Sequence, residues 1–88
     1  MLIVFYRTRL CPRCYLARKW LSELTRNVPD LHIDEREVLH SPRQILHEGI
    51  RMIPAIRIGD QILSGAVLTK RKINDFLRKN GCQPQKLP

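Results

Sequence analysis

Two cysteines separated by two residues form the segment Cys11-Pro12-Arg13-Cys14 in a chain of 88 residues. Such a pair can interconvert between a dithiol and a disulfide, or it can supply two ligands to a metal ion. An apolar run over residues 2–6, typical of a buried strand, ends shortly before the pair, and Pro12 suits the first turn of a helix. We therefore expect Cys11 at the N-cap of a helix, where the helix dipole and the free backbone N–H groups favour a thiolate.

The spacing gives the two cysteines different roles. Cys14 comes three residues after Cys11, so both lie on the same face of the helix within reach of a disulfide. Arg13 between them, with Arg7 and Arg9 just before, should favour the thiolate of Cys11 further and attract acidic substrates. The predicted chemistry is thiol–disulfide exchange, in which Cys11 attacks a substrate disulfide and Cys14 then releases the reduced product.

A metal site is the first alternative. It would need two more ligands, and the candidates are Cys82, His32, His40 and His47. None of them has the close spacing of a second ligand pair in a zinc finger or ribbon. We therefore predict no bound metal and no bound cofactor, and keep a redox-sensing or metal-sensing module that uses the cysteine pair as ligands as the alternative function.

The composition is that of a soluble globular protein. Hydrophobic residues make up 43% and charged residues 27%, and no apolar run approaches the roughly 20 residues that span a bilayer. The odd number of cysteines argues against a structural disulfide framework, so we expect a cytoplasmic location. We also expect a monomer that makes no membrane contact. The net charge of +8 makes acidic partners plausible, and a basic adaptor is the second alternative. No nucleic-acid-binding motif is present, so nucleic acid is not a predicted partner.

Helical spacing of apolar residues predicts a helix after the cysteine pair, with Leu16, Trp20, Leu21 and Leu24 on its buried face. Asn27, Pro29 and Asp30 then predict a loop, and alternation over residues 31–35 predicts a short strand. The final helix has an N-cap at Thr69, a hydrophobic staple between Leu68 and Ile73, and an end at Asn80-Gly81.

Between these elements, Ser41-Pro42 predicts the start of a short helix that runs to about Glu48. Residues 53–58 and 61–63 predict two strands, and Gly59-Asp60 between them suits a type II′ hairpin. The order is therefore β-α-β-α-β-β-α, with the first two strands parallel and the hairpin antiparallel. We predict an α/β fold with a mixed four-stranded sheet flanked by three helices, formed by residues 1–81, and an irregular tail over residues 82–88.

Residues 2–80 resemble a glutaredoxin, or a closely similar redoxin, of the thioredoxin superfamily. The resemblance is carried by four segments: Val4-Phe5-Tyr6, Cys11-Pro12-Arg13-Cys14, Met52-Ile53-Pro54 and Gly59-Asp60-Gln61-Ile62-Leu63-Ser64-Gly65. It implies a thioredoxin-like fold and a cis bond between Ile53 and Pro54. It further implies that Pro54 faces the cysteine pair, and that backbone groups of Ile53 pair with an extended substrate.

The chain departs from the glutaredoxin pattern in ways that affect its partners. Arg13 stands where glutaredoxins usually have Tyr, and Val67 and Leu68 stand where acidic residues hold the γ-glutamyl end of glutathione. The segment Ser64-Gly65 followed by apolar residues resembles redoxins that serve ribonucleotide reductase and are recharged by a reductase. We therefore expect protein disulfides or small disulfides as substrates, with a reductase or glutathione as electron donor and glutathione at most a co-substrate.

The predicted site has a catalytic pair and a set of substrate-binding residues. The pair is Cys11 and Cys14. The substrate-binding set is Arg9, Pro12, Arg13, Ile53, Pro54 and Gly65.

Overall fold

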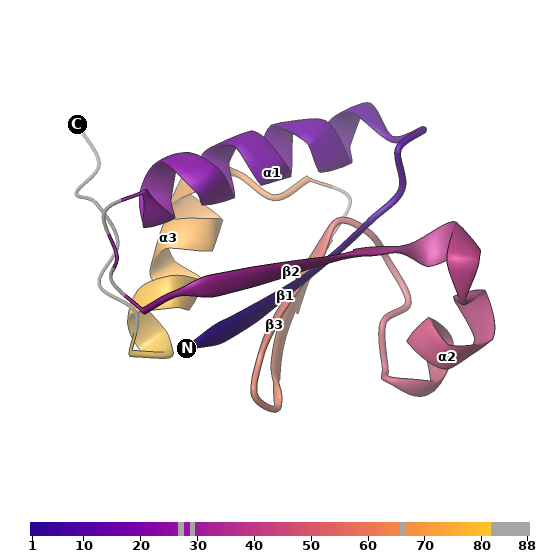
Figure 1. The fold of residues 1–88 in the computed structure, drawn as a ribbon. Coiled ribbons are helices and arrows are strands. Elements are labelled where there is room, and N and C mark those ends of the chain that lie inside the picture. Colours follow the sequence, from indigo (N-terminus) through magenta and orange to yellow (C-terminus); the bar gives the residue numbers. More distant parts are fainter. Residues whose placement is uncertain (27, 29, 66, 82–88) are drawn as a thin grey trace.

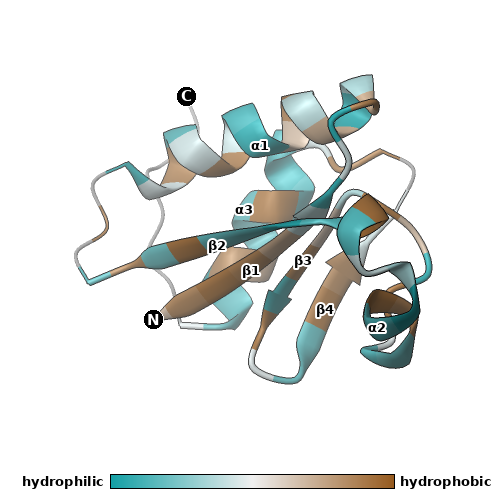
Figure 2. Cartoon of the chain, turned by 45° about the vertical axis from the view of Figure 1, so that its right-hand side comes forward, coloured by the Kyte–Doolittle hydropathy of each residue, from teal (hydrophilic) through white to brown (hydrophobic). Residues whose placement is uncertain are grey.

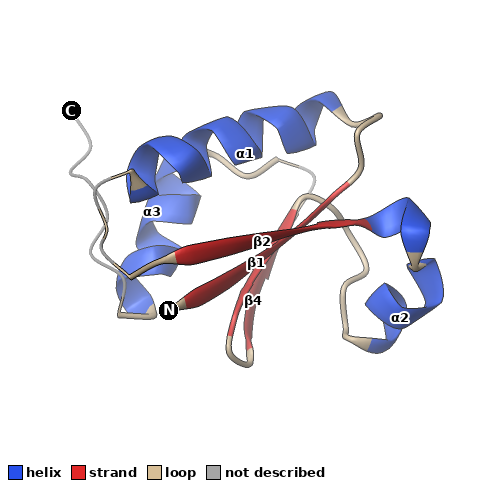
Figure 3. Ribbon diagram, in the orientation of Figure 1, coloured by secondary structure: helices blue, strands red, loops and turns tan. Residues whose placement is uncertain are grey.

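The element order is β-α-β-α-β-β-α, with one short 3-10 helix added after the second strand (Figures 1 and 3). The computed structural model describes residues 1–26, 28, 30–65 and 67–81. The elements are β1 (Leu2–Arg7), α1 (Pro12–Thr25), β2 (His32–Glu37), the 3-10 helix η1 (Val38–His40), α2 (Pro42–His47), β3 (Ala55–Ile58), β4 (Gln61–Ser64) and α3 (Lys70–Lys79). The predicted mixed sheet with three α-helices is confirmed.

The sheet has the strand order β2-β1-β3-β4, which puts β1 in its middle. β1 runs parallel to β2, in a register that pairs Leu2 with His32 and Arg7 with Glu37, and antiparallel to β3. Figure 2 shows β1 as a hydrophobic strand, whereas β2 becomes hydrophilic towards its C-terminal end. The apolar run of β1 is thus explained by burial on both faces.

Two clusters of buried side chains hold the sheet. The larger one lies between the sheet and the helices α1 and α3, and contains Ile3, Phe5, Ala17, Leu21, Leu24, Ile56, Leu68, Ile73 and Leu77. The smaller one lies on the other face, next to the short helix α2, and contains Val4, Tyr6, Ile45, Ile50 and Ala55. Alternate residues of β1 therefore enter opposite clusters, as the two-residue period of a strand requires.

The buried face of α1 differs from the predicted one. Cys14, Ala17, Leu21 and Leu24 are buried, whereas Leu16 is 43% exposed. The small side chains at positions 14 and 17 form the N-terminal part of the buried face, and Leu16 lies outside that face, towards solvent. The prediction was wrong at Leu16 because hydropathy favours the larger apolar residue over a small one.

The ends of several elements follow local chemistry. The hydroxyl of Thr69 accepts a hydrogen bond from the backbone N–H of Lys72 at 3.2 Å, and both Leu68 and Ile73 are buried, so the predicted cap and staple are confirmed. Gly59 has a φ of 59°, and Asp60 is not among the described residues with positive φ, a combination that fits the predicted type II′ turn.

All four strands differ by one or two residues from the predicted bounds; β1 and β4 each end one residue later, at Arg7 and Ser64, and β2 begins one residue later, at His32. β3 begins at Ala55 rather than at residue 53, because Pro54 has no N–H to donate to a strand ladder. β2 extends two residues further, to Glu37, because its parallel pairing follows β1 as far as Arg7.

Three parts of the sequence prediction lie outside the described residues: Asn27 and Pro29 of the first loop, and the tail over residues 82–88 with Cys82. Within the part of the chain that the structure describes, no helix is both long and apolar enough to cross a membrane.

Candidate active site

The topology brings the predicted site to one edge of the sheet. Tyr6 at the end of β1 pairs with Ala55 at the start of β3, which in turn pairs with Ser64 at the end of β4. The segments just beyond these residues therefore share an edge, and they carry Cys11, Pro54 and Gly65. The bond between Ile53 and Pro54 is cis, as the resemblance implied.

Cys11 is the N-cap residue of α1, as predicted. Its backbone is extended, with φ −108° and ψ 110°, and Pro12 occupies the first helical position. The backbone N–H of Cys14 donates a hydrogen bond to the Sγ of Cys11 at 3.3 Å. Both cysteines are free thiols, Cys11 half-buried and Cys14 buried. An N-cap side chain normally supplies an oxygen to these N–H groups, and here a sulfur takes its place.

The two thiols differ in acidity. Burial acts to raise the pKa of Cys11, but hydrogen bonds from Cys14 and Arg13 outweigh it, and the pKa is lowered overall. Burial raises the pKa of Cys14 to about 11, with a further contribution from its hydrogen bond to Cys11. Because the thiolate is the reactive form, the half-buried Cys11 is the more reactive thiol of the pair.

This difference predicts two separate pH profiles for alkylation by iodoacetamide. A thiolate forms as the pH rises through the pKa, so Cys11 should react with a midpoint below that of an ordinary cysteine, and Cys14 with one near 11. The measurement is the alkylation rate of each cysteine by mass spectrometry across a pH series. The same chain unfolded in urea is the control, in which the two midpoints should coincide. Faster reaction of Cys14 at neutral pH would contradict the assignment.

Glu37 ties the loop that carries Cys11 to the neighbouring strand. Its Oε2 accepts hydrogen bonds from the Nη1 of Arg7 at 3.0 Å and from the backbone N–H of Arg9 at 3.1 Å. Burial acts to raise the pKa of Glu37, but the donors around it and the Arg7 charge outweigh this, and the pKa is lowered. The loop is closed by a further hydrogen bond from the N–H of Cys11 to the carbonyl of Thr8 at 3.1 Å. The carboxylate is therefore a structural anchor of the active-site loop.

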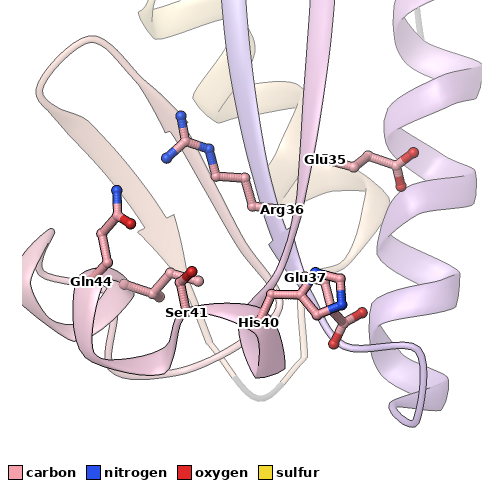
Figure 4. Close-up of a pocket in the computed structure, with 7 residues that line it drawn as sticks. Glu35, Arg36, Glu37, His40, Ser41 and Gln44 are labelled. Atoms are coloured by element: carbon pink, nitrogen blue, oxygen red, sulfur yellow. The ribbon is translucent and has the colours of Figure 1, made fainter.

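Glu35 makes a second set of ion pairs on the same side of β2. Its Oε1 lies 3.2 Å from the Nε of Arg7 and 2.9 Å from the Nε of Arg18 on α1. Figure 4 shows the side chain of Glu35 directed towards α1 and that of Arg36 directed away from it. Sequence reasoning missed Glu35 and Glu37; the charged run 34–37, placed opposite β1, was the signal that could have identified them.

Arg36 belongs to a network on the opposite face. Its Nη1 lies 3.2 Å from the Oε1 of Glu48, and the other oxygen of Glu48 accepts a hydrogen bond from the Tyr6 hydroxyl at 2.8 Å. The network joins the end of α2 to the sheet. A cavity of about 250 Å³ between β2, η1 and α2 lies beside it (Figure 4).

Ile53 borders a separate, largely apolar cavity of about 220 Å³ on the α2 side. Its other lining residues are Val38, Pro42, Ile45, Leu46, Ile50, Arg51 and Met52. Leu46 and Met52 are exposed apolar side chains here. Neither the N–H nor the C=O of Ile53 makes a backbone hydrogen bond within the described residues. This segment therefore offers unpaired backbone groups beside an apolar surface.

The remaining predicted residues lie as follows. Pro12, Arg13 and Arg9 are exposed, and Gly65 is half-buried after β4. Leu68 is only 3% exposed and belongs to the larger core cluster.

The candidate metal ligands are dispersed where the structure describes them. His32 pairs with Leu2, at the end of the sheet opposite to the cysteines, and His40 and His47 lie on η1 and α2. Over residues 1–26, 28, 30–65 and 67–81, no three His, Cys, Asp or Glu side chains gather as a metal site would require. Cys82, the fourth candidate, lies outside these residues.

Comparison with known proteins confirms the expected thioredoxin-like fold. No protein-family model matches the chain. The sequence is 23% identical over 78 residues to a thioredoxin of Methanocaldococcus jannaschii, covering 88% of this chain and 92% of that protein. Among solved structures, mitochondrial thioredoxin 3 of Saccharomyces cerevisiae has a TM-score of 0.73 at 17% identity, covering 89% of this chain and 76% of that one. The glutaredoxin-like NrdH-redoxin of Escherichia coli, described as thioredoxin-like in its activity profile, has a TM-score of 0.60 at 22% identity, covering 85% and 93%.

Proposed function

We propose that this thioredoxin-fold chain is a dithiol–disulfide oxidoreductase in which Cys11 is the nucleophile and Cys14 the resolving thiol. The observation that carries the proposal is the geometry of the pair: Cys11 caps α1, its Sγ accepts the backbone N–H of Cys14 at 3.3 Å, and Cys14 is buried behind it. The pKa shifts agree with this arrangement, since the pKa of Cys11 is lowered and that of Cys14 is raised. An exchange catalyst needs one thiolate and one thiol that stays protonated until the mixed disulfide forms, and this pair has both. The similarity to a thioredoxin sequence supports the same chemistry.

The reaction proceeds in two displacements. The Cys11 thiolate attacks one sulfur of the substrate disulfide; the substrate S–S bond breaks, and the departing thiolate takes a proton from solvent. Cys14 then loses its proton and attacks the Sγ of Cys11, which releases the second substrate thiol. The substrate gains two electrons and two protons, and the protein is left with a Cys11–Cys14 disulfide. An external donor of two electrons must reduce that disulfide again.

The substrate would dock as an extended segment along the edge that holds Ile53, Pro54 and Gly65. The unpaired backbone groups of Ile53 fit a short β-like pairing with such a segment. The apolar cavity beside Ile53 would take a side chain of the substrate. Pro12 and Arg13, both exposed next to Cys11, would contact the substrate from the helix side.

A reductase is the proposed electron donor, in preference to glutathione. Val67 and Leu68 stand where acidic residues would hold the γ-glutamyl group; Val67 is exposed but apolar and Leu68 is buried in the core, so neither offers a carboxylate to that group. The E. coli protein of similar fold is a glutaredoxin-like redoxin with a thioredoxin-like activity profile, and this supports a reductase rather than glutathione as the donor. We further propose that the protein acts as a cytoplasmic monomer.

A redox titration tests the function and its direction. The pure protein is equilibrated with defined ratios of thiol to disulfide, alkylated, and analysed by mass spectrometry. Cys11 and Cys14 should lose their thiols together in a two-electron step, with a midpoint between roughly −270 and −120 mV. If the thiols become reactive only after a chelator is added, the pair binds metal and the oxidoreductase proposal is wrong.

The electron donor is tested with the oxidised protein. NADPH with a thioredoxin reductase should reduce it at a rate that rises with protein concentration. Glutathione with glutathione reductase should reduce it much more slowly. The reverse order would overturn the proposed donor and leave the exchange chemistry intact.

A further inference from the structure

A third cavity lies directly beside Cys11. This cavity, which we call the arginine subsite, has a volume of about 210 Å³. It is lined by Arg7, Thr8, Arg9, Cys11, Tyr15 and Arg18. Three of these six residues carry a guanidinium group, and one is the attacking cysteine. The cavity therefore places positive charge next to the sulfur that the substrate must approach.

We call the edge that holds Ile53, Pro54 and Gly65 the docking edge. The arginine subsite and this docking edge lie on opposite sides of Cys11. Arg7 and Arg18 both reach Glu35 on β2, so the arginine subsite is on the β2 side of β1. Ile53 and Pro54 precede β3, which pairs with the other side of β1. A substrate segment on the Pro54 side can therefore react at Cys11 while another of its groups occupies the arginine subsite.

The charges in the arginine subsite are only partly neutralised. Arg7 is paired with Glu35 and Glu37, and Arg18 with Glu35. Arg9 is different, because its backbone N–H is held by Glu37 while its exposed guanidinium makes no ion pair with any described residue. The anchored backbone limits where this guanidinium can lie, and leaves it available for a charge from outside the chain.

Tyr15 gives the arginine subsite an apolar wall. It lies on the first turns of α1, and its side chain is 66% exposed although it is aromatic. A glutamate or aspartate side chain has the same two parts, a short aliphatic stem and a terminal carboxylate. Its stem can pack on the ring of Tyr15 while its carboxylate meets the guanidinium of Arg9.

We propose that the arginine subsite binds the carboxylate of a glutamate or aspartate close to the reacting cysteine of a protein disulfide. The inference rests on the proposed function, and it names acidic protein disulfides as the preferred substrate class. It predicts selection by charge at a point separate from the docking edge at Pro54.

The test uses disulfide-bonded peptides that differ only in Glu or Gln, placed in turn at each of the three positions on either side of the cysteine. For at least one position, the wild-type protein should reduce the Glu peptide faster in kcat/KM, by roughly three- to tenfold at low salt, the size of one charge-assisted contact. Arg9→Gln should abolish this preference, so that the Glu and Gln peptides are reduced with the same kcat/KM. Arg9→Lys should restore part of it, and added salt should weaken it.

Arg78→Gln is the matched control, since it removes the same charge from the C-terminal end of α3 (Figure 1). It should keep the full preference for the Glu peptide. An equal loss with all peptides in Arg9→Gln, or the absence of any preference for Glu in the wild-type protein, would overturn the arginine subsite while the oxidoreductase function stands. Failure of the wild-type protein to reduce any peptide would instead refute the proposed function.

Discussion

Replacing Cys11 by Ser should reduce disulfide exchange to the uncatalysed rate, whereas replacing Cys14 by Ser should stop the reaction halfway. The first change removes the only thiol of the pair with a lowered pKa. The second leaves that nucleophile in place but removes the group that resolves the mixed disulfide. Cys14→Ser should therefore accumulate a covalent adduct with a substrate, close to one per chain, and the adduct should dissolve on addition of dithiothreitol.

Both variants are expected to fold, which makes the result interpretable. Serine is a good N-cap residue, so Cys11→Ser keeps an acceptor for the backbone N–H of Cys14. Circular dichroism and thermal unfolding of each variant provide the control, and mass spectrometry of trapped adducts provides the measurement. Retained activity in Cys11→Ser, together with no adduct in Cys14→Ser, would show that the roles are assigned wrongly.

Phe5→Ala should lower the free energy of unfolding by about 3–5 kcal/mol, because it empties a large buried volume in the middle of the fold. Phe5 is fully buried on the central strand, in the cluster formed with α1 and α3. It pairs with Glu35 of β2 on one side and with Ile56 of β3 on the other. Small domains are stable by only about 5–15 kcal/mol, so this single change removes a large share.

Leu2→Ala on the same strand is the matched control. Leu2 is half exposed, and its truncation should change the free energy of unfolding much less than that of Phe5. Urea unfolding followed by circular dichroism measures both variants. A loss for Phe5→Ala no larger than that for Leu2→Ala would show that the cluster on the α1 side is not the main core.

The elements with strong local signals could be predicted from the sequence. The continuous apolar run of β1, the cap at Thr69 and the turn at Gly59 each depend on residues adjacent in the chain, and the structure contains them all. The same holds for Cys11 at the start of α1, because Pro12 and the preceding strand specify that position locally. These features needed no information about distant contacts.

The features that could not be predicted from the sequence depend on contacts between distant residues. Leu16 is exposed and Cys14 buried because α1 turns the face with Cys14, Ala17, Leu21 and Leu24 towards the core, a choice that hydropathy along the helix does not encode. Glu35 and Glu37 look like surface charges of a strand end until the parallel register places Glu37 opposite Arg7. Tyr15 and Arg18 line the cavity beside Cys11 only because α1 passes β2, where Glu35 pairs with Arg18.

The hydrogen bond from Arg9 to Glu37 joins two residues that are 28 positions apart. The loop before Cys11 thus has its final shape only after the chain has crossed over and β2 has paired with β1. A chain still being synthesised, or one that has lost β2 through local unfolding, keeps the N-cap at Cys11 but lacks the contact that fixes the backbone of Arg9. The N-cap at Cys11 is therefore local, whereas the placement of the Arg9 backbone beside it depends on the completed pairing of β1 with β2.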